Sequence, residues 1–184
     1  MYTVEGNVNG AGAALEWLRR EPGMEELDSR LPQWLAAPGE PPLFLNGIAG
    51  LGGPFWKPDF ASRFVDEGEH WQRAVAVVES MAFLLQANLE EMAKHVAPPA
   101  RVRVSGGVSQ IDGLCHRLAA LSGLPVHRRE DAEATARGIG YLAAGRPSSW
   151  NRSAIEQVFA PGEDAGIRAR YRRWRALMAE ATGV

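Results

Sequence analysis

The clearest candidate for chemistry in this sequence is a pair of glycines, Gly106 and Gly107, that stands between a strand pattern and a helix pattern. Two glycines let the backbone turn sharply and expose its N–H groups. The start of the following helix would face the same point, and its partial positive charge suits a phosphate or another polar ligand. Glycine is also the ordinary residue of structural turns, and Ser105 and Ser109 suit helix caps, so the segment alone predicts either a ligand site or a plain turn.

The other reactive residue types show no pattern of a catalytic or metal site. The four histidines lack metal-ligand spacing and a matching pattern of carboxylates, so no metal site is expected. Cys115 lies near Leu114 and Leu118 on an apolar helix face, which predicts a position in the core. Neither a GxSxG nucleophile motif nor a complete dinucleotide-binding fingerprint is present.

The basic run "RARYRRWR" near the C-terminus raises the question of nucleic-acid binding. Acidic residues flank this run, and Tyr171 and Trp174 stand three positions apart within it. The pattern favours a helix with a solvated charged face and an aromatic packing side. No nucleic-acid partner is therefore expected.

The length and charge of the chain are typical of one globular α/β domain. It has 184 residues, a formal net charge of -2 and a near-neutral isoelectric point, which give no general attraction to nucleic acid or to an anionic membrane. The single cysteine, the lack of a signal-peptide pattern and the lack of a long apolar run predict a cytoplasmic protein with no membrane partner.

The order of elements also predicts an α/β fold. Apolar residues recur at helical spacing from residue 71 to 96, which predicts one long buried helix. A strand over 102–104, a helix over about 109–122, a strand near Val126 and a helix over about 132–144 follow. Such alternation with short connections predicts a sheet with helices packed on its faces.

The first 45 residues and the tail after Gly145 show less regular patterns. A short helix is expected after Gly12, and a strand over 43–45 leads into a glycine-rich loop. Residues 21–41 contain four prolines, so we expect a loop there with one helical turn near 31–36. The tail after Gly145 predicts one or two further helices. The first residues read as the middle of a strand, which suggests that the chain is a fragment or a natural truncation.

Several segments, taken in order, resemble the C-terminal half of the FGGY carbohydrate kinases, with the glycerol kinases of that family most similar in pattern. No single segment is decisive, but their shared order and rough spacing are specific, and the likeness extends from residue 2 to about residue 175. The segments are "YTVEGNVNGAGAALEWLR", "GLGGPFWKPDF", "RAVAVVESMAFLLQANLEEM", "RVSGGVSQ" and "EATARGIGYLAAG".

The resemblance implies a ribonuclease H-like, actin-like ATPase lobe with a mixed sheet and helices on its faces, truncated at its N-terminus. It implies a nucleotide-binding lobe over residues 1–145 and a helical extension of the same domain over residues 146–184. In this family ATP phosphorylates a sugar or polyol in the cleft between two lobes. The cofactor implied is therefore ATP or ADP, accompanied by Mg²⁺ in the complete enzyme.

The resemblance also assigns residues to the nucleotide. Gly106 and Gly107 would lie against its adenosine end, and Gly12 and Glu16 would line the same pocket. Gly12 and Glu16 are four residues apart and so share one helix face.

The chain departs from the family pattern at a residue expected to contact the nucleotide. Where the family has Asn or Ser bonded to the nucleotide, this chain has Ile111, which can pack on a base but cannot form that hydrogen bond. The adjacent Asp112 is the nearest possible substitute, although a carboxylate repels phosphate.

The groups that the family uses for catalysis are expected outside these residues. The family's catalytic Asp, its sugar contacts and its phosphate loops belong to the first lobe or to the hairpin before this segment, so no catalytic residue is assigned here. Phosphoryl transfer depends on positioning and charge stabilisation, so the chain alone is predicted to be inactive.

Two functions remain open at this point. The first is the nucleotide-binding lobe of an ATP-dependent sugar or polyol kinase. The second is a non-catalytic remnant that serves as an interaction or regulatory module. Missing strands would expose a sheet edge, so self-association or pairing with a first lobe is also expected.

Overall fold

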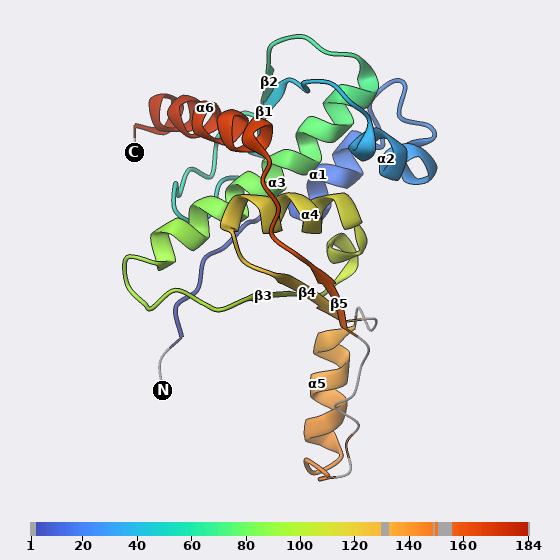
Figure 1. Cartoon of the computed structure of the whole chain (residues 1–184), viewed down its shortest axis with the longest axis vertical. Helices are drawn as coiled ribbons and strands as arrows, with labels where there is room; N and C mark the ends of the chain where they lie inside the picture. The colour runs from blue at the N-terminus through green and yellow to red at the C-terminus, as the bar shows by residue number, and fades with distance from the viewer. Residues whose placement is uncertain (1–2, 130–132, 149, 151–155, 184) are drawn as a thin grey trace.

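The fold is described from a computed structural model of the chain, which covers residues 3–129, 133–148, 150 and 156–183. A long helix, α3 (His70–Met92), runs through the middle of the molecule, and the other elements pack around it (Figure 1). The side chains of Glu69 and Gln72 form a capping box at its start. Its buried residues lie on more than one side, as the broad apolar pattern predicts.

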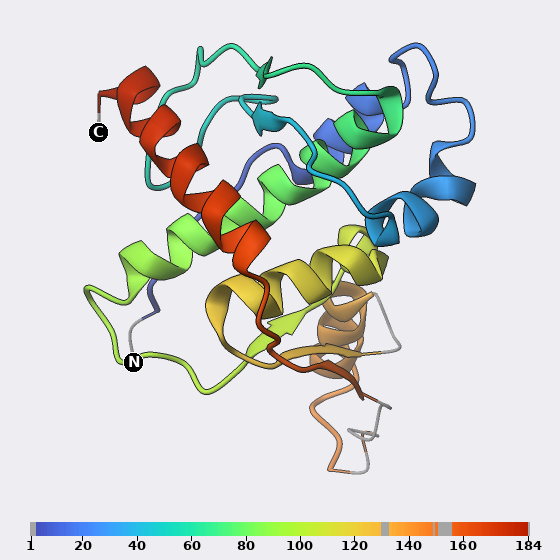
Figure 2. The same ribbon diagram turned by 45° about the horizontal axis from the view of Figure 1, so that its top comes forward.

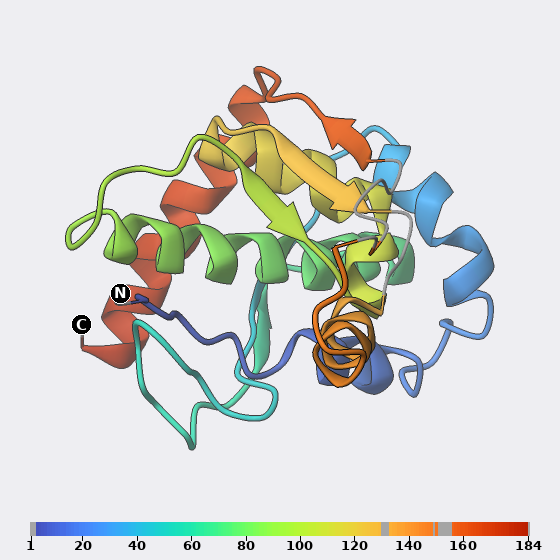
Figure 3. The same cartoon turned by 90° about the horizontal axis from the view of Figure 1, so that it is seen from below.

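The larger sheet lies on one side of α3 and is mixed. Its strands are β3 (Val102–Val104), β4 (Val126–Arg129) and β5 (Glu156–Phe159), in that spatial order. Strands β3 and β4 are parallel, β5 is antiparallel to β4, and α4 (Asp112–Ser122) connects the two parallel strands and packs on the sheet (Figure 3). The predicted mixed sheet with helices on its faces is confirmed.

A second, two-stranded sheet lies on the other side of α3. Strands β1 (Leu43–Leu45) and β2 (Arg63–Val65) pair antiparallel, and the C-terminal helix α6 (Ala165–Thr182) contacts β1. In Figure 2 the red helix α6 passes in front of α3. The indole N–H of Trp174 donates to the carbonyl of Phe44 at 3.1 Å. Tyr171 and Trp174 are buried, so the aromatic packing side predicted for this helix is confirmed.

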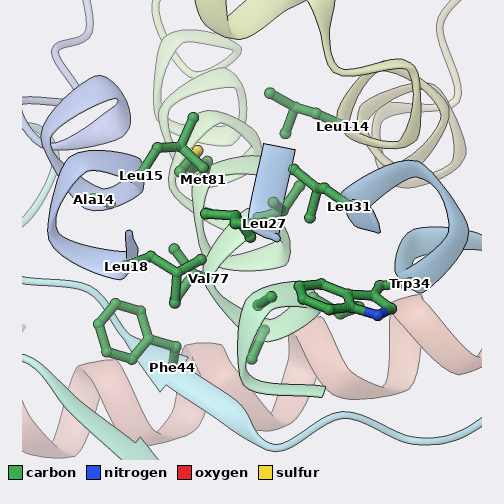
Figure 4. Close-up of a cluster of buried hydrophobic side chains, with 14 of the residues drawn as sticks. Ala14, Leu15, Leu18, Leu27, Leu31, Trp34, Phe44, Val77, Met81 and Leu114 are labelled. Carbon is green, nitrogen blue, oxygen red and sulfur yellow. The ribbon is translucent and has the colours of Figure 1, made fainter. Parts of the chain in front are cut away.

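The region predicted as a proline-rich loop contains a full helix. Helix α2 (Leu27–Ala36) spans 10 residues, includes Pro32, and packs against α3 and α4, with α1 (Ala11–Leu18) sharing the same apolar cluster. Its apolar side chains enter the cluster shared with α1, β1, α3 and α4 (Figure 4). Proline removes one helical hydrogen bond, but the buried face offsets that loss, so the prediction of a single turn was too short.

Other differences from the sequence-based predictions lie near the ends. Residues 3–8 form no strand, and the tail contains strand β5 in addition to a helix. Helix α5 (Ala134–Ala143) has no buried residue and extends away from the other elements (Figure 1). Its Ile139 and Leu142 are 63% and 56% exposed. In the part of the chain that the structure describes, no helix is long and apolar enough to cross a bilayer.

The contact between α6 and α3 predicts a loss of stability in alkali. Burial raises the pKa of Tyr171, and so does the hydrogen bond that its hydroxyl donates to Glu90 at 2.8 Å. Below the unfolded pKa of about 10 both states keep the phenolic proton. Above it the unfolded chain loses that proton first, so the free energy of unfolding falls as the pH rises.

Urea unfolding at pH 8 and pH 11 tests this with Tyr171→Phe. The variant should be less stable at pH 8 by about 1 kcal/mol, because one hydrogen bond is lost. It should also lose less stability than the original chain between the two pH values. Equal losses in the two proteins would contradict the role of Tyr171.

Candidate functional site

A pocket of about 920 Å³ opens between α1, α2 and the segment that joins β3 to α4. That segment contains a short 3-10 helix, η1 (Gly107–Gln110). The volume is within the range of small-molecule sites. The lining residues are Gly12, Leu15, Glu16, Arg19, Asp28, Leu31, Pro32, Leu35, Ala36, Gly107, Val108, Gln110, Ile111, Asp112, Gly113, His116 and Arg117.

Two apolar walls face this pocket. Leu15, Leu31 and Leu35 come from α1 and α2, whereas Val108 and Ile111 come from η1 and the start of α4. Leu15 and Leu31 are also part of the main core cluster (Figure 4). Because core packing holds these side chains, the pocket is formed before any ligand enters it.

The glycines of the pocket differ in what surrounds them. A Cβ atom built on Gly12 or on Gly107 would meet no atom within 4 Å, so the backbone is open to a ligand at both positions. Gly106 has φ +88°, a conformation that side chains rarely adopt, and its carbonyl accepts a hydrogen bond from the Ser109 hydroxyl at 2.6 Å. Gly106 therefore shapes the turn, and Gly107 faces the pocket.

Five of the six residues that the sequence predicts for a nucleotide site line this one pocket. They come from segments about 100 positions apart, and only the fold brings them together. Gly106 is not among the lining residues. The five are Gly12, Glu16, Gly107, Ile111 and Asp112.

The charged groups at the α1–α2 side of the pocket bind one another. Arg19 donates to both oxygens of Asp28, with Nη2 to Oδ1 at 2.8 Å, and it also contacts Glu16. The hydrogen bond from Arg19 holds the pKa of Asp28 below its usual value, and the same bond raises the pKa of Arg19. Glu16 is consequently part of an ion-pair cluster and not an isolated acid.

Asp112 is also paired with an arginine. Arg128 of β4 donates to Asp112 Oδ1 at 2.7 Å and to the carbonyl of Ser109 at 2.8 Å. This pairing offsets the negative charge that would otherwise repel phosphate. The side chain of Asp112 remains 59% exposed, so a ligand can still reach it.

Arg117 is a lining residue that no sequence pattern indicates. It donates to Glu79 Oε1 at 3.1 Å, to the carbonyl of Gly113 at 3.2 Å and to the carbonyl of Leu35 at 3.1 Å. The residues contributed by α2 are also missing from the sequence-based site, although the spacing of Leu27, Leu31 and Leu35 is a helical signal. Four prolines obscured that signal.

Glu16, Asp28 and Asp112, carboxylates that line the pocket, are each paired with an arginine. In residues 3–129, 133–148, 150 and 156–183, no group of three or more His, Cys, Asp or Glu side chains is placed to hold a metal ion.

The fold is the actin-like ATPase fold of the sugar kinases. The structure of Plasmodium falciparum glycerol kinase with ADP matches 95% of this chain and 37% of its own, with a TM-score of 0.74 and 17% identity. Ligand-bound xylulose kinase from Lactobacillus acidophilus matches 95% of this chain and 38% of its own, with a TM-score of 0.72 and 21% identity. Identities this low show the fold alone.

The chain belongs to the FGGY family of carbohydrate kinases, whose C-terminal domain matches residues 1–145. The predicted family is thus confirmed. A glycerol kinase from Allorhizobium ampelinum is 33% identical over 178 residues, covering 91% of this chain and 33% of that protein. The chain therefore spans about a third of the length of this curated relative.

Cys115 of α4 is buried between this helix and the larger sheet, and the reactivity of its thiol tests how tightly they pack. Its thiol is buried and donates to the carbonyl of Ser109 at 3.4 Å, and burial raises its pKa. We expect a chromogenic disulfide reagent at pH 8 to leave the native thiol unmodified and to react fully in urea. Rapid stoichiometric labelling of the native chain would contradict this packing.

Proposed function

We propose that this chain is the nucleotide-binding lobe of an ATP-dependent carbohydrate kinase and that the pocket between α1, α2 and α4 holds the adenosine end of ATP or ADP. The observation that carries the proposal is the convergence of Gly12, Glu16, Gly107, Ile111 and Asp112 on one pocket. The ADP present in the Plasmodium falciparum glycerol kinase structure supports the same class of ligand.

The lining suits the flat, mostly apolar face of a purine. Leu31 and Leu35 on one side and Val108 and Ile111 on the other supply apolar surface for the ring. Gly12 and Gly107 leave the backbone open for a close approach by the ribose or the base. Polar atoms of Gln110 and His116, which also line the pocket, are available to the edge of the base.

Ile111 makes apolar burial the main source of affinity at its position. The side chain packs against a base but forms no hydrogen bond with it, so we expect binding in the micromolar to millimolar range. Mg²⁺ would be held through the nucleotide's phosphates, because Glu16, Asp28 and Asp112 are engaged by arginines.

The proposed acceptor of the phosphoryl group is a sugar or polyol. Transfer to it would need catalytic groups besides the residues proposed to bind the nucleotide. A reacting γ-phosphate must be positioned and its charge stabilised, and none of the pocket residues is proposed as the base on an acceptor hydroxyl. We therefore propose that the isolated chain binds nucleotide without turnover. The second candidate, a non-catalytic interaction module, is favoured only by Ile111.

Titration of ADP and ATP against the purified chain, with Gly12→Leu as the variant, tests nucleotide binding. A Cβ atom at this position meets no neighbouring atom, and leucine improves helix propensity by up to about 1 kcal/mol, so the fold should be retained. It would occupy the pocket, and nucleotide binding should be lost. Gly138→Leu in α5 is the matched control, because its Cβ also enters open space but outside the pocket, and it should bind normally.

Saturable binding by the original chain and by Gly138→Leu, but not by Gly12→Leu, is the expected result. No binding at millimolar nucleotide would overturn the proposal and favour the interaction module. Binding by Gly12→Leu with unchanged affinity would place the nucleotide elsewhere.

Turnover is tested separately with ATP, Mg²⁺ and glycerol. The rate of ADP formation with the isolated chain should equal the rate without protein, because the positioning groups are not supplied. An ADP formation rate that depends on both glycerol and this chain would contradict the predicted inactivity. The nucleotide titration in the same buffer is the control that the pocket is occupied under the assay conditions.

A further inference from the structure

We infer that Arg117 is a positioning residue for this pocket: it holds the end of α2 against the start of α4 and so sets the spacing of the two walls. The inference rests on the proposed function, because the quantity it controls is affinity for nucleotide. Arg117 itself lines the pocket, as do Leu35 and Gly113, the two residues whose carbonyls it binds.

The hydrogen bond to Leu35 satisfies a backbone carbonyl at the C-terminal end of α2. Leu35 lies in the last turn of α2, where backbone carbonyls have no donor within the helix. The guanidinium supplies a donor at 3.1 Å and places a positive charge at the negative end of the helix. Among the residues that the structure describes, this is the hydrogen bond found between a side chain of α4 and the backbone of α2.

A buried carboxylate fixes the orientation of Arg117. Glu79 on α3 is 1% exposed and accepts from Arg117 Nε at 3.1 Å. Arg170 of α6 donates to both oxygens of the same carboxylate, at 3.0 and 2.7 Å. Because the Glu79 carboxylate is held by arginines on both sides, it fixes the plane of the Arg117 guanidinium. In that orientation the Arg117 Nη2 group donates to the carbonyl of Leu35.

The two helices already touch where Arg117 joins them. A Cβ atom added to Gly113 would lie 2.7 Å from Cδ1 and 2.9 Å from Cβ of Leu35. Such distances are too short for real atoms, so α2 and α4 are in tight contact here with no room for a side chain at position 113. A small shift of α2 would therefore change the pocket directly.

Arg170 gives a matched control within the same network. It binds the same carboxylate and is almost equally buried, with 15% of its side chain exposed against 16% for Arg117. It comes from α6 and does not line the pocket. Replacing either arginine leaves Glu79 with one partner, but only Arg117 also holds α2.

The experiment compares Arg117→Lys and Arg117→Met with Arg170→Lys and Arg170→Met in the full chain. Lysine keeps the charge beside Glu79 but lacks the planar fork that reaches three acceptors. We expect both Arg117 variants to weaken ADP binding by about tenfold or more and both Arg170 variants by less than about twofold. Thermal midpoints should fall in both pairs.

Amide hydrogen exchange gives a readout that a general loss of stability does not reproduce. Arg117→Lys should speed exchange in the last turn of α2 and leave α6 protected, whereas Arg170→Lys should do the reverse. If Arg117→Met does not fold, Gly113→Ala is the alternative variant. It keeps every charge, pushes on Leu35, and should also weaken ADP binding.

The outcomes separate the two proposals. An original chain that does not bind ADP overturns the proposed function and this inference with it. An original chain that binds ADP, with Arg117→Lys and Gly113→Ala binding equally well, overturns the inference alone. Equal loss of affinity in the Arg117 and Arg170 pairs also overturns it, because the network would then contribute only stability.

Discussion

The structure depends on one buried carboxylate. Glu79 lies in the middle of α3 and is paired with Arg117 and Arg170, which come from different helices. A buried charge costs several kcal/mol unless it is paired, and removing one partner of such a pair costs about 3–5 kcal/mol. Burial alone would lower the pKa of Arg170, but the hydrogen bond and charge of Glu79 outweigh it and raise that pKa. The network ties α4 and α6 to α3.

The pocket shares its walls with the core. Leu15 and Leu31 line the pocket and also pack in the main apolar cluster (Figure 4). Dense packing allows such side chains little movement, so the shape of the pocket follows from the stability of the fold. The charged groups around it are likewise held by protein partners, as Asp112 is by Arg128. The shape and charge of the pocket thus depend on contacts that also stabilise the fold.

Prediction from the sequence was most accurate where a local pattern was strong. The long helix, the strands over 43–45 and 102–104, and the packing side of α6 were predicted from the spacing of apolar residues. Prediction was poorer where local signals conflict. Pro32 argued against a helix that forms because its apolar face is buried, and strand β5 was missed because β4 and not local sequence determines its pairing.

The sequence by itself determined the α/β alternation from α3 to α5, the family and five residues that line the pocket. Only the tertiary structure decided that Gly107 and not Gly106 faces the pocket and that Arg117 connects its walls. The physical reason is distance along the chain. Helical periodicity and turn preference act over a few residues, whereas Arg117 binds a carboxylate 38 positions away and a carbonyl 82 positions away. Contacts of that range exist only after the whole core has assembled.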